Sequence, residues 1–587
     1  MLGVIAALVV AVFAARLVQV QGINGPAVAA EALESRLGTV TELAHRGDIT
    51  DADGVVLATS VERYEVFADQ KVIAEFVPAD WQKVDGKTVE GRGAVAVARL
   101  LAPALGRDPL ELAAELVPAD GASFNRHKVL AKDVVPEVQR VIAGLGLSSM
   151  IGTTLTAERL YPAGTVAGNL VGYTGREDDG SLVGRGGAES MFESDLAGTA
   201  GTFTYERGLG GQQIPTGEEE RVDAVPGKDV ALTILNDVQW KAEDSLNDAV
   251  RSTGASYGIA VVMDVRTGQL VALADSGAVD PNDRSTSAVA NGSRAVSNVF
   301  EPGSTGKVVT MAALLESGLA KADSEFSVPD TYTTSNGETF HDSHDHPTER
   351  LTLAGILAAS SNTGTVMAGQ ELPNQVRYDY LRKFGFGQKT GLGMPGESAG
   401  LLADVDDWDG RTQYTVLFGQ GLAVNAIQAT DVFATIANGG VRVEPSIVRG
   451  TTDEDGTFTP APAPTSTRVV SEKTAETVLH MMEGVVDGDG GTGKAAAVPG
   501  YRVAGKTGTA QMAGAGGALS SYMSSFIGVA PVDDPRYAVA VFLKDPRTSI
   551  YGGDVAAPVF ADVMGFTLQH TGVAPSTEAA EPLPQEW

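Results

Sequence analysis

The stretch Phe-Glu-Pro-Gly-Ser-Thr-Gly-Lys at residues 300–307, followed by Val-Val-Thr-Met-Ala-Ala-Leu-Leu at 308–315, organises this chain. The Pro-Gly pair interrupts regular structure, and the apolar run after it predicts a helix that ends near Gly318. If that helix begins at Ser304, Lys307 lies one turn further on and faces the same way. Free backbone N–H groups at the helix start then favour a developing negative charge. The pattern therefore indicates a serine nucleophile beside an amine.

A serine nucleophile needs such a neighbour because its hydroxyl is a poor nucleophile until a base takes the proton. Lysine can act as that base when burial or a second cation lowers its pKa. An isolated Ser-x-x-Lys is more often a helix cap followed by a surface lysine. However, Lys307 is the one lysine in this sequence with a serine three residues before it.

Length and composition limit the possible functions. The chain has 587 residues, which is too long for one core and predicts three or four structural units. The hydrophobic content of 43% excludes wholesale disorder. A net charge of −31 argues against a nucleic-acid partner, which would require basic patches. The absence of cysteine excludes disulfides, thiolate metal sites and thiol catalysis.

The N-terminus predicts a membrane anchor at residues 1–23. Residues 2–15 are apolar, and after Arg16 the apolar character continues to residue 23, so a helix here would measure about 33 Å. The alternative is a signal peptide cleaved near residues 27–29, although that site lies far beyond the apolar run. No Lys or Arg precedes the span, so we expect translation to begin upstream of Met1 and the catalytic part to lie outside the cell.

The rest of the chain divides into a first unit at 24–222, a second at 223–565 and a disordered tail at 566–587 rich in Glu, Ala and Pro. In the first unit, apolar spacing predicts a helical stalk at 24–45. A hairpin is predicted at Asp53-Gly54. Helices are predicted near 91–104, 109–117 and 133–145, before a glycine-rich strand region. The second unit begins with a short strand at 231–234, a helix from Asp237 and a strand at 258–265, and strands and helices then alternate. The sequence thus predicts an α/β (α+β) protein.

A serine–lysine acyl-transfer site also requires a Ser-x-Asn motif. Ser360-Ser361-Asn362 follows Ser304 by 56 residues, just beyond a helical run at 351–359, where a loop can present it to a cleft. Ser245-Leu246-Asn247 also fits, but it precedes Ser304 and lies in a polar-faced helix. We therefore select Ser360 and Asn362.

The third motif, Lys-Thr-Gly, also occurs twice. Lys506-Thr507-Gly508-Thr509 follows a strand-like run at 501–505, whereas Lys389-Thr390-Gly391 lies in a glycine-rich loop. The chemistry needs this motif on a strand edge that can pair with an extended peptide, which favours Lys506. Residues 500–507 also fit the phosphate-loop pattern, but the glycines after Lys506 oppose the helix that such a loop requires.

Histidines at 341, 344 and 346, with Asp342 and Asp345, resemble a metal cluster. Their spacing is not that of a standard zinc site. We expect a structural loop near the cleft, and we predict no metal and no cofactor.

With the three motifs in order, the chain resembles the class B penicillin-binding proteins, and most closely the septal type of high-GC Gram-positive bacteria. Further similar segments are Arg46-Gly47-Asp48-Ile49, Arg159-x-Tyr161-Pro162, Gly187-Ala188-Glu189, residues 291–307, Phe418-Gly419-Gln420-Gly421, residues 437–440 and residues 524–528. The resemblance implies a transpeptidase domain at 223–565, preceded by an elongated pedestal, or dimerisation, domain at 24–222 and the membrane anchor. No glycosyltransferase domain like that of the bifunctional class is visible.

The resemblance also implies roles for the motif residues on stem peptides ending in D-Ala-D-Ala. Ser304 would attack the carbonyl while neutral Lys307 takes its proton, and Lys506 would stay cationic, helping to keep Lys307 neutral. Ser360 would shuttle protons and Asn362 would bond the peptide amide. The N–H groups of Ser304 and Thr509 would bind the oxyanion, and Thr507 and Thr509, flanking Gly508, would contact the substrate carboxylate.

The implied partners are β-lactams, the membrane, a SEDS-type glycosyltransferase and other division proteins. Three alternatives stay open: an elongation-type transpeptidase, a β-lactam sensor, and a scaffold for a division complex. A β-lactamase is disfavoured, because no Glu-x-x-Leu-Asn run lies between the second and third motifs.

Overall fold

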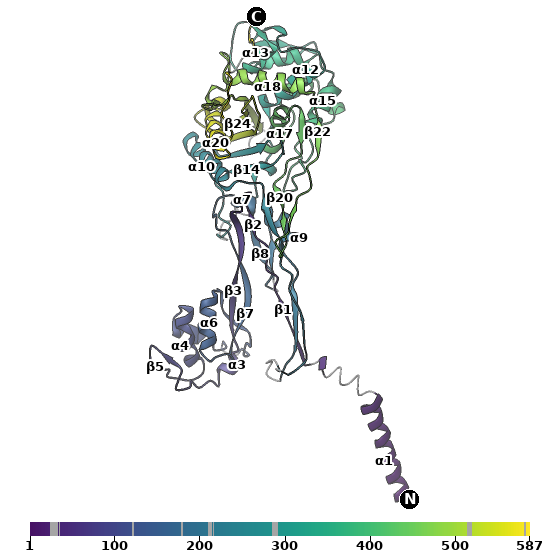
Figure 1. Cartoon of the computed structure of the whole chain (residues 1–587), viewed down its shortest axis with the longest axis vertical. Helices are drawn as coiled ribbons and strands as arrows, with labels where there is room; N and C mark the ends of the chain where they lie inside the picture. Colours follow the sequence, from purple (N-terminus) through teal and green to yellow (C-terminus); the bar gives the residue numbers. More distant parts are fainter. Residues whose placement is uncertain are drawn as a thin grey trace.

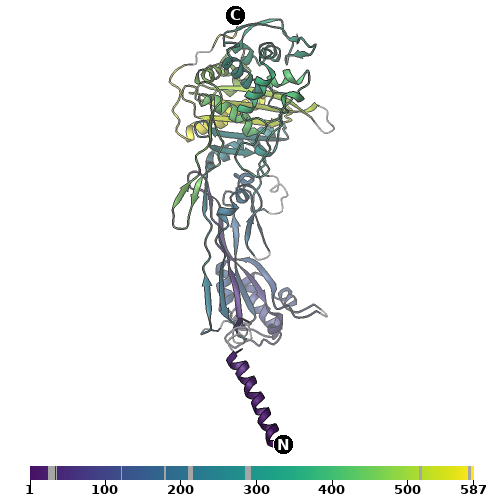
Figure 2. The ribbon, with the colours of Figure 1, turned by 90° about the vertical axis from the view of Figure 1, so that its right-hand side faces the viewer.

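The computed structural model of the chain describes residues 1–23, 33–34, 36–119, 122–177, 180–208, 214, 216–283, 292–513, 519–579 and 583–587. The molecule is elongated, as Figures 1 and 2 show. A mixed α/β unit that holds the C-terminus occupies one end, and long strands lead from it toward the N-terminal helix at the other end.

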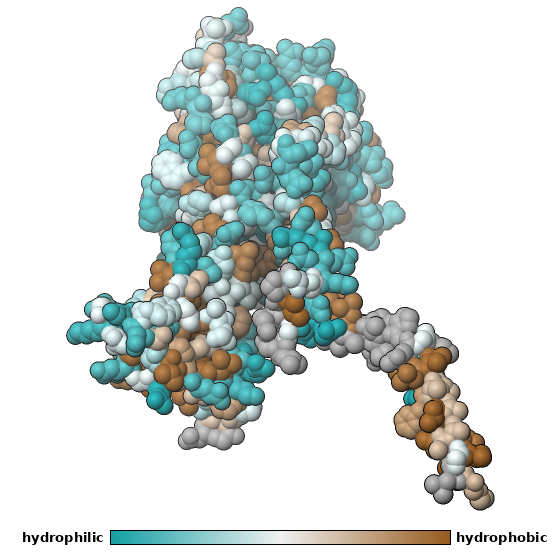
Figure 3. Space-filling view, turned by 60° about the horizontal axis from the view of Figure 1, so that its bottom comes forward, coloured by the Kyte–Doolittle hydropathy of each residue, from teal (hydrophilic) through white to brown (hydrophobic). Residues whose placement is uncertain are grey.

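The N-terminal helix α1 (Leu2–Val18) continues into a π-helical segment, η1 (Gln19–Ile23). Its apolar side chains are exposed and project away from the body of the molecule in Figure 3. In the part of the chain that the structure describes, no helix combines the length and the apolar character needed to cross a membrane. The anchor predicted for residues 1–23 is therefore not confirmed.

Long antiparallel strands build the pedestal. Its strands are β1 (Leu37–Glu42), β2 (Ile49–Thr50), β3 (Val56–Ala68), β4 (Lys83–Val84), β5 (Lys87–Thr88), β6 (Lys128–Val134), β7 (Ile151–Leu160), β8 (Thr174–Arg176), β9 (Leu182–Gly184), β10 (Gly201–Glu206) and β11 (Glu219–Val222). Its helices are α3 (Gln70–Ile73), α4 (Gly93–Leu105), α5 (Pro109–Glu115), α6 (Pro136–Gly144), α7 (Gly168–Val171), α8 (Gly187–Met191) and α9 (Glu193–Leu196). β3 pairs with β7 from Thr59↔Leu160 to Ala68↔Ile151, which gives the pedestal its length.

Local sequence signals account for several of these elements. The predicted hairpin joins β2 to β3, with Gly54 at a φ of 86° that suits glycine. Asp51 Oδ1 stabilises this turn by accepting the N–H groups of Asp53 and Val55, both at 2.8 Å. The helices predicted near 91–104, 109–117 and 133–145 are confirmed as α4, α5 and α6.

The predicted helical stalk at 24–45 was wrong for residues 37–42, while residues 24–32 and 35 lie outside the described residues. Leu37–Glu42 is strand β1, and Val40 pairs with Phe203 of β10. The prediction rested on the helical spacing of a few apolar residues. Pairing with a distant strand decided the structure instead, and a local sequence pattern carries no information about such pairing.

A buried ion network joins segments of the pedestal that are far apart in the sequence. Glu189 accepts from Arg46 Nε at 2.8 Å and from Arg159 Nε at 2.6 Å, and the three side chains are almost completely buried. Arg159 Nη1 also donates to Ser60 Oγ at 3.0 Å. Arg46, Arg159 and Glu189 belong to the segments that carried the family resemblance in the pedestal.

We expect Glu189→Ala to lower the free energy of unfolding by about 3–5 kcal/mol, because it leaves two buried guanidinium groups without their shared carboxylate. Urea denaturation measures this change. Glu158→Ala is the matched control, because the Arg63–Glu158 pair is partly exposed and its loss should cost less than about 1 kcal/mol. Equal effects of the two substitutions would contradict the assigned role of the buried network.

The second unit holds the catalytic motifs. Its strands are β12 (Asp229–Leu232), β13 (Tyr257–Asp264), β14 (Leu270–Asp275), β15 (Glu325–Val328), β16 (Thr331–Thr333), β17 (Thr339–His341), β18 (Glu349–Thr352), β19 (Val441–Val443), β20 (Val448–Thr452), β21 (Phe458–Pro460), β22 (Ser466–Arg468), β23 (Ala504–Ala513), β24 (Leu519–Ala530) and β25 (Tyr537–Lys544). Its α-helices are α10 (Asn236–Thr253), α11 (Arg294–Ser297), α12 (Lys307–Glu316), α13 (Leu353–Ala358), α14 (Asn362–Gly369), α15 (Asn374–Lys383), α16 (Thr412–Thr415), α17 (Ala426–Ala437), α18 (Glu472–Val486), α19 (Gly552–Val555) and α20 (Ala557–His570). Its short 3₁₀ helices are η3 (Gly303–Gly306), η4 (Val405–Asp407), η5 (Val416–Phe418) and η6 (Lys494–Ala496).

A central antiparallel sheet in the order β14-β13-β25-β24-β23 separates two cores. Along β13, Ala260 and Val262 pack with α10 and α20 on one face, whereas Ile259 and Val261 pack with α12 and α17 on the other. This period of two is the alternation that a strand imposes on its side chains. β20 and β21 extend from this unit to the pedestal sheet, where β20 pairs with β12.

The C-terminal tail departs from the prediction of disorder over 566–587. α20 runs to His570, and residues 583–587 lie against the second unit, where Leu351 and Glu586 form a β-bridge. The polar, proline-rich composition suggested a solvated segment, but backbone pairing and a specific side-chain socket order it. Residues 580–582 lie outside the described residues.

Candidate active site

The turn that carries Ser304 is a 3₁₀ helix, so the α-helix begins at Lys307 and not at Ser304 as predicted. Gly303 makes the turn possible with a φ of 54°. A Cβ at that position would also come within 3.1 Å of Ala510 on β23. The nucleophile turn therefore packs directly against the strand that carries the third motif.

Ser304 is half-buried and lines a cleft of about 950 Å³. All three motifs reach this cleft, which is also lined by Ser360, Asn362, Thr507 and Thr509. Lys307 and Lys506 are completely buried beside these lining residues. The structure thus brings together residues that lie up to 205 positions apart in the sequence, between Ser304 and Thr509.

Burial controls the protonation of Lys307. Its Nζ donates to Asn362 Oδ1 at 2.8 Å, to the Ser360 carbonyl and, at 3.5 Å, to Ser360 Oγ. Burial lowers the pKa of Lys307 to about 7, although the nearby Asp342 carboxylate acts in the opposite direction. Near neutral pH a large share of Lys307 is therefore unprotonated and able to accept a proton.

Ser360 lies between the two amines. Its backbone has a φ of 61°, which is unusual for a residue other than glycine and indicates a conformation held by its surroundings. Lys506 Nζ lies 2.7 Å from Ser360 Oγ and 3.1 Å from the Thr507 carbonyl. Ser360 can therefore pass a proton between the cleft and either lysine.

The order in which the two lysines bind a proton differs from the one expected. Burial, and next the charge on Lys307, lower the pKa of Lys506 far below its usual value. Only Lys307 has a carboxylate, that of Asp342, to favour its charged form. Because like charges disfavour each other, the Asp342 carboxylate favours Lys307 over Lys506 as the charged member of the pair.

The third motif lies on β23, at the end of the sheet order. Gly508 is required there by space, because a Cβ would lie 2.3 Å from Ser525 Oγ and 3.0 Å from Thr305 Cγ2. Thr507 and Thr509 point to the same side of the strand, as residues two apart do, and both line the cleft.

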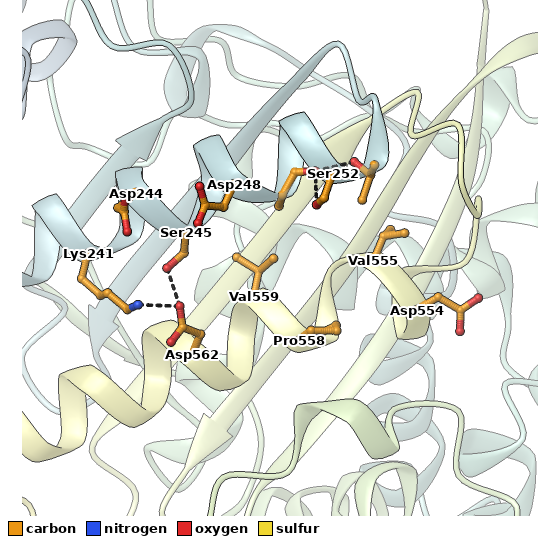
Figure 4. A pocket seen from close by; sticks show the side chains of 12 residues that line it. Lys241, Asp244, Ser245, Asp248, Ser252, Asp554, Val555, Pro558, Val559 and Asp562 are labelled. Carbon is orange, nitrogen blue, oxygen red and sulfur yellow. Dashed lines mark hydrogen bonds and ion pairs between the residues drawn. The ribbon is translucent and has the colours of Figure 1, made fainter.

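The rival Lys-Thr-Gly at 389–391 does not reach the cleft. Lys389 is exposed on the loop after α15, and buried Thr390 donates its hydroxyl to Glu397 at 2.6 Å. The rival Ser-x-Asn does not line this cleft either. Figure 4 shows Ser245 on α10, donating to Asp562 of α20 at 2.7 Å, beside a separate cavity of about 360 Å³.

Sequence reasoning missed the role of Asp342. Its carboxylate accepts the Thr363 N–H at 3.0 Å, the Asn362 N–H and the Ser361 hydroxyl at 2.7 Å, and it therefore holds the start of α14 in place. His346 Nε2 lies 3.1 Å from the same carboxylate. Among the residues that the structure describes, no acidic and histidine cluster is arranged to hold a metal. The histidine-rich pattern drew attention to this loop, but only the fold connects it to Asn362.

We expect Asp342→Ala to slow acylation by penicillin about tenfold or more, because the start of α14, which carries Asn362 and follows Ser360, loses its anchor. The substitution should also move the rising limb of the pH–rate profile to lower pH. The Asp342 charge raises the pKa of Lys307, so its removal lets the neutral amine form at a lower pH.

Rates of fluorescent-penicillin labelling across pH measure both effects. The control is Asp345→Ala, an exposed neighbour whose loss should change the rate by less than about twofold. A pH limb that stays in place in Asp342→Ala would contradict the electrostatic part of this account.

Comparison with known proteins gives consistent results. The penicillin-binding protein transpeptidase domain matches residues 258–565, and the penicillin-binding protein dimerisation domain matches residues 41–232. The chain is 35% identical to penicillin-binding protein PbpB of Mycolicibacterium smegmatis over 99% of this chain and 91% of that protein. It is 33% identical to the peptidoglycan D,D-transpeptidase FtsI of Escherichia coli over 90% of this chain and 84% of that protein.

A crystal structure of penicillin-binding protein 3 from Mycobacterium tuberculosis in complex with ampicillin is similar, with a TM-score of 0.70 and 31% identity. The likeness covers 93% of this chain and 100% of that one. The motifs converge in one cleft, and matches to both domain families extend along almost the whole chain. The chain therefore belongs to the penicillin-binding proteins that carry a transpeptidase domain behind a dimerisation domain.

Proposed function

We propose that this chain is a serine-type peptidoglycan D,D-transpeptidase that crosslinks stem peptides ending in D-Ala-D-Ala and is inhibited by β-lactams. The observation that carries the proposal is the cleft in which Ser304 faces Ser360 and Thr509, with the two lysines buried behind it. The D,D-transpeptidase name of the Escherichia coli relative supports the substrate class. The ampicillin complex of the Mycobacterium tuberculosis protein supports β-lactams as ligands.

Acylation begins when the terminal carboxylate of the substrate enters beside Thr507 and Thr509. An anion here favours the charged form of Lys506, and that new cation disfavours the proton on Lys307. Substrate binding thus makes Lys307 neutral at the moment when Ser304 needs a base. In this order Lys506 becomes cationic when the substrate carboxylate binds. The family resemblance had implied a Lys506 that is cationic throughout.

In the chemical step, Ser304 Oγ bonds to the carbonyl carbon while its proton passes to Lys307 Nζ. The backbone N–H groups of Ser304 and Thr509 stabilise the oxyanion. The C–N bond to the terminal D-Ala then breaks, and the leaving amine takes a proton through Ser360. Asn362 orients the peptide amide. An amine of a neighbouring stem peptide attacks the ester, forms the new amide and returns the proton to Ser304.

A donor pentapeptide and an acceptor amine test this reaction. Liquid chromatography with mass spectrometry should detect one D-Ala released for each amide product formed. A reaction that yields only the hydrolysed tetrapeptide would replace transpeptidation by carboxypeptidation. Covalent labelling by penicillin without any peptide turnover would favour the sensor or scaffold functions.

We further propose the setting in which the enzyme works. Residues 1–23 anchor the chain as a single membrane span. The pedestal at 24–222 carries the transpeptidase domain at 223–565 outside the cell. The protein acts in division with a SEDS-type glycosyltransferase. Support comes from the apolar helix α1 and from the resemblance to septal enzymes. Loss of membrane association on deleting residues 1–23, and localisation of the tagged protein at the septum, test these points separately.

A further inference from the structure

The last five described residues, Leu-Pro-Gln-Glu-Trp at 583–587, pair with the second unit through the antiparallel bridge between Leu351 and Glu586. The Thr352 N–H donates to the Gln585 carbonyl at 3.0 Å, and the Trp587 N–H donates to the Arg350 carbonyl at 3.3 Å. The segment therefore lies antiparallel to the end of β18. Figure 1 shows the C-terminus at this end of the molecule, close to α13. Backbone pairing of this kind is how proteins bind extended peptides.

Gln585 occupies a socket whose walls are glycines. Its Nε2 donates to the Gly484 carbonyl at 3.0 Å, and its Oε1 accepts the Gly490 N–H at 3.3 Å. A Cβ at Gly355 would lie 2.0 Å from the Gln585 carbonyl oxygen, and one at Gly488 would lie 1.9 Å from Gln585 Nε2. Neither Gly355 nor Gly488 has a positive φ. Space for Gln585 therefore accounts for the glycine at 355, whereas at 488 a Cβ would also lie 2.4 Å from the Gly484 carbonyl oxygen.

The residues on either side of Gln585 strengthen the attachment. Thr352 Oγ1 donates to the Pro584 carbonyl at 2.6 Å, and Trp587 Nε1 donates to the Phe326 carbonyl at 3.2 Å. The Arg350 guanidinium lies 5.3 Å from the centre of the Trp587 ring, a cation–π contact. Leu583 packs on the main core. The segment thus has a specific site along its whole length.

The socket is built from two elements that continue into the catalytic cleft. α13, which carries Gly355, ends two residues before Ser360. The turn after α18, which carries Gly488 and Gly490, leads directly to Thr492. Thr492 Oγ1 lies 3.4 Å from the Ala358 carbonyl at the end of α13 and 2.9 Å from Thr507 Oγ1 in the third motif.

We propose that residues 583–587 act as an intramolecular ligand, and that Gln585 is a positioning residue for acylation. By holding the turn after α18 against α13, the segment places Thr492 where it orients the Thr507 hydroxyl. This inference rests on the proposed function of Thr507 as a contact for the substrate carboxylate. Its specific consequence is that the segment controls how tightly the carboxylate is bound before the chemical step.

The first experiment compares the full chain with a chain that ends at residue 582. Fluorescent-penicillin kinetics separate the dissociation constant of the non-covalent complex from the maximal acylation rate. We expect the shortened chain to bind penicillin about tenfold more weakly, with a maximal rate within about threefold of wild type, because positioning of the carboxylate contact is lost and the base is not.

Rescue with a peptide distinguishes positioning from a general loss of structure. The peptide Leu-Pro-Gln-Glu-Trp, added to the shortened chain, should restore penicillin binding. The same peptide carrying Gln585→Glu should fail, because a carboxylate oxygen would face the Gly484 carbonyl. The peptide carrying Glu586→Gln should succeed, because the Glu586 side chain is exposed. In the full chain, Gln585→Glu should weaken penicillin binding in the same way as the shortening.

Three results would overturn the proposal: a shortened chain with wild-type kinetics, equal rescue by the three peptides, or a full-length Gln585→Glu variant that binds penicillin normally. If the shortened chain does not fold, the full-length variant alone decides. Fluorescence anisotropy of labelled Leu-Pro-Gln-Glu-Trp on the shortened chain measures the socket without any catalysis. If the shortened chain binds the peptide but penicillin does not acylate the full chain, the proposed function is refuted and the socket is not.

Discussion

Ser304→Ala is expected to abolish covalent labelling by penicillin, whereas the wild-type adduct should persist for many minutes. Ser304 lines the cleft beside the motif residues, and of the described serines that line it only Ser304 lies three residues before Lys307. Persistence is expected because no Glu-x-x-Leu-Asn run, which supplies a hydrolytic base in class A β-lactamases, lies between the second and third motifs; the run at residues 243–247 precedes Ser304 and lies on α10. Intact-protein mass spectrometry over time measures the formation and the loss of the adduct.

Ser297→Ala is the matched control for this experiment. Ser297 lies on α11, seven residues before the nucleophile, and its hydroxyl donates to the Ser293 carbonyl at 2.9 Å. Labelling should stay within about twofold of wild type. An adduct that forms on Ser304→Ala, or a wild-type adduct that is lost within seconds, would contradict the acyl-enzyme account.

Lys506→Ala is expected to lower the acylation rate by at least about 100-fold, a typical cost of removing a preorganised electrostatic group. The substitution removes the amine 2.7 Å from Ser360 Oγ and the cation that forms when a carboxylate binds. Lys389→Ala carries the same change in the rival motif. Because Lys389 is exposed on a loop, its loss should change the rate by less than about threefold.

The pH dependence of acylation tests the link between the two lysines. Because the pKa of Lys307 is about 7, the rate in wild type should rise as the pH increases through neutrality and the amine loses its proton. At saturating penicillin, Lys506→Ala should move this rise to higher pH, since the cation that disfavours the proton on Lys307 is gone. If Lys389→Ala, and not Lys506→Ala, greatly lowers the acylation rate, the third motif is residues 389–391 and not residues 506–508.

Much of the site could be predicted from the sequence because its chemistry lies in short ordered motifs. The predicted loop at Ser360 favoured it over Ser245, and the predicted strand at Lys506 favoured it over Lys389. In the structure Lys506 Nζ lies 2.7 Å from Ser360 Oγ, which lines the cleft. The sequence left open whether burial or a second cation lowers the pKa of Lys307, and in the structure burial is the larger cause. The reversed order of the two lysine protons was not expected, because it depends on the position of Asp342.

The features that could not be predicted depend on contacts between distant segments. Asp342 accepts a hydrogen bond from the backbone N–H of Asn362. Every residue except proline has this group, so the sequence gives no sign of the contact. β1 had helical spacing but pairs with β10, which lies about 160 residues further on. Gln585 lies in a proline-rich tail, whose composition predicts disorder. The glycines that form its socket, Gly355 and Gly488, lie far from it in the sequence, and no sequence pattern connects them to it.

The most direct test of the central claim locates the acyl group after reaction with penicillin. Tryptic cleavage after Arg294 and Lys307 gives the peptide of residues 295–307, which contains Ser297 and Ser304. Fragmentation of this peptide by tandem mass spectrometry assigns the added mass to one of its three hydroxyls, those of Ser297, Ser304 and Thr305. The account predicts that the mass lies on Ser304, in wild type and in Ser297→Ala alike. An acyl group found on Ser297 or Thr305, or on a peptide outside residues 295–307, would contradict it.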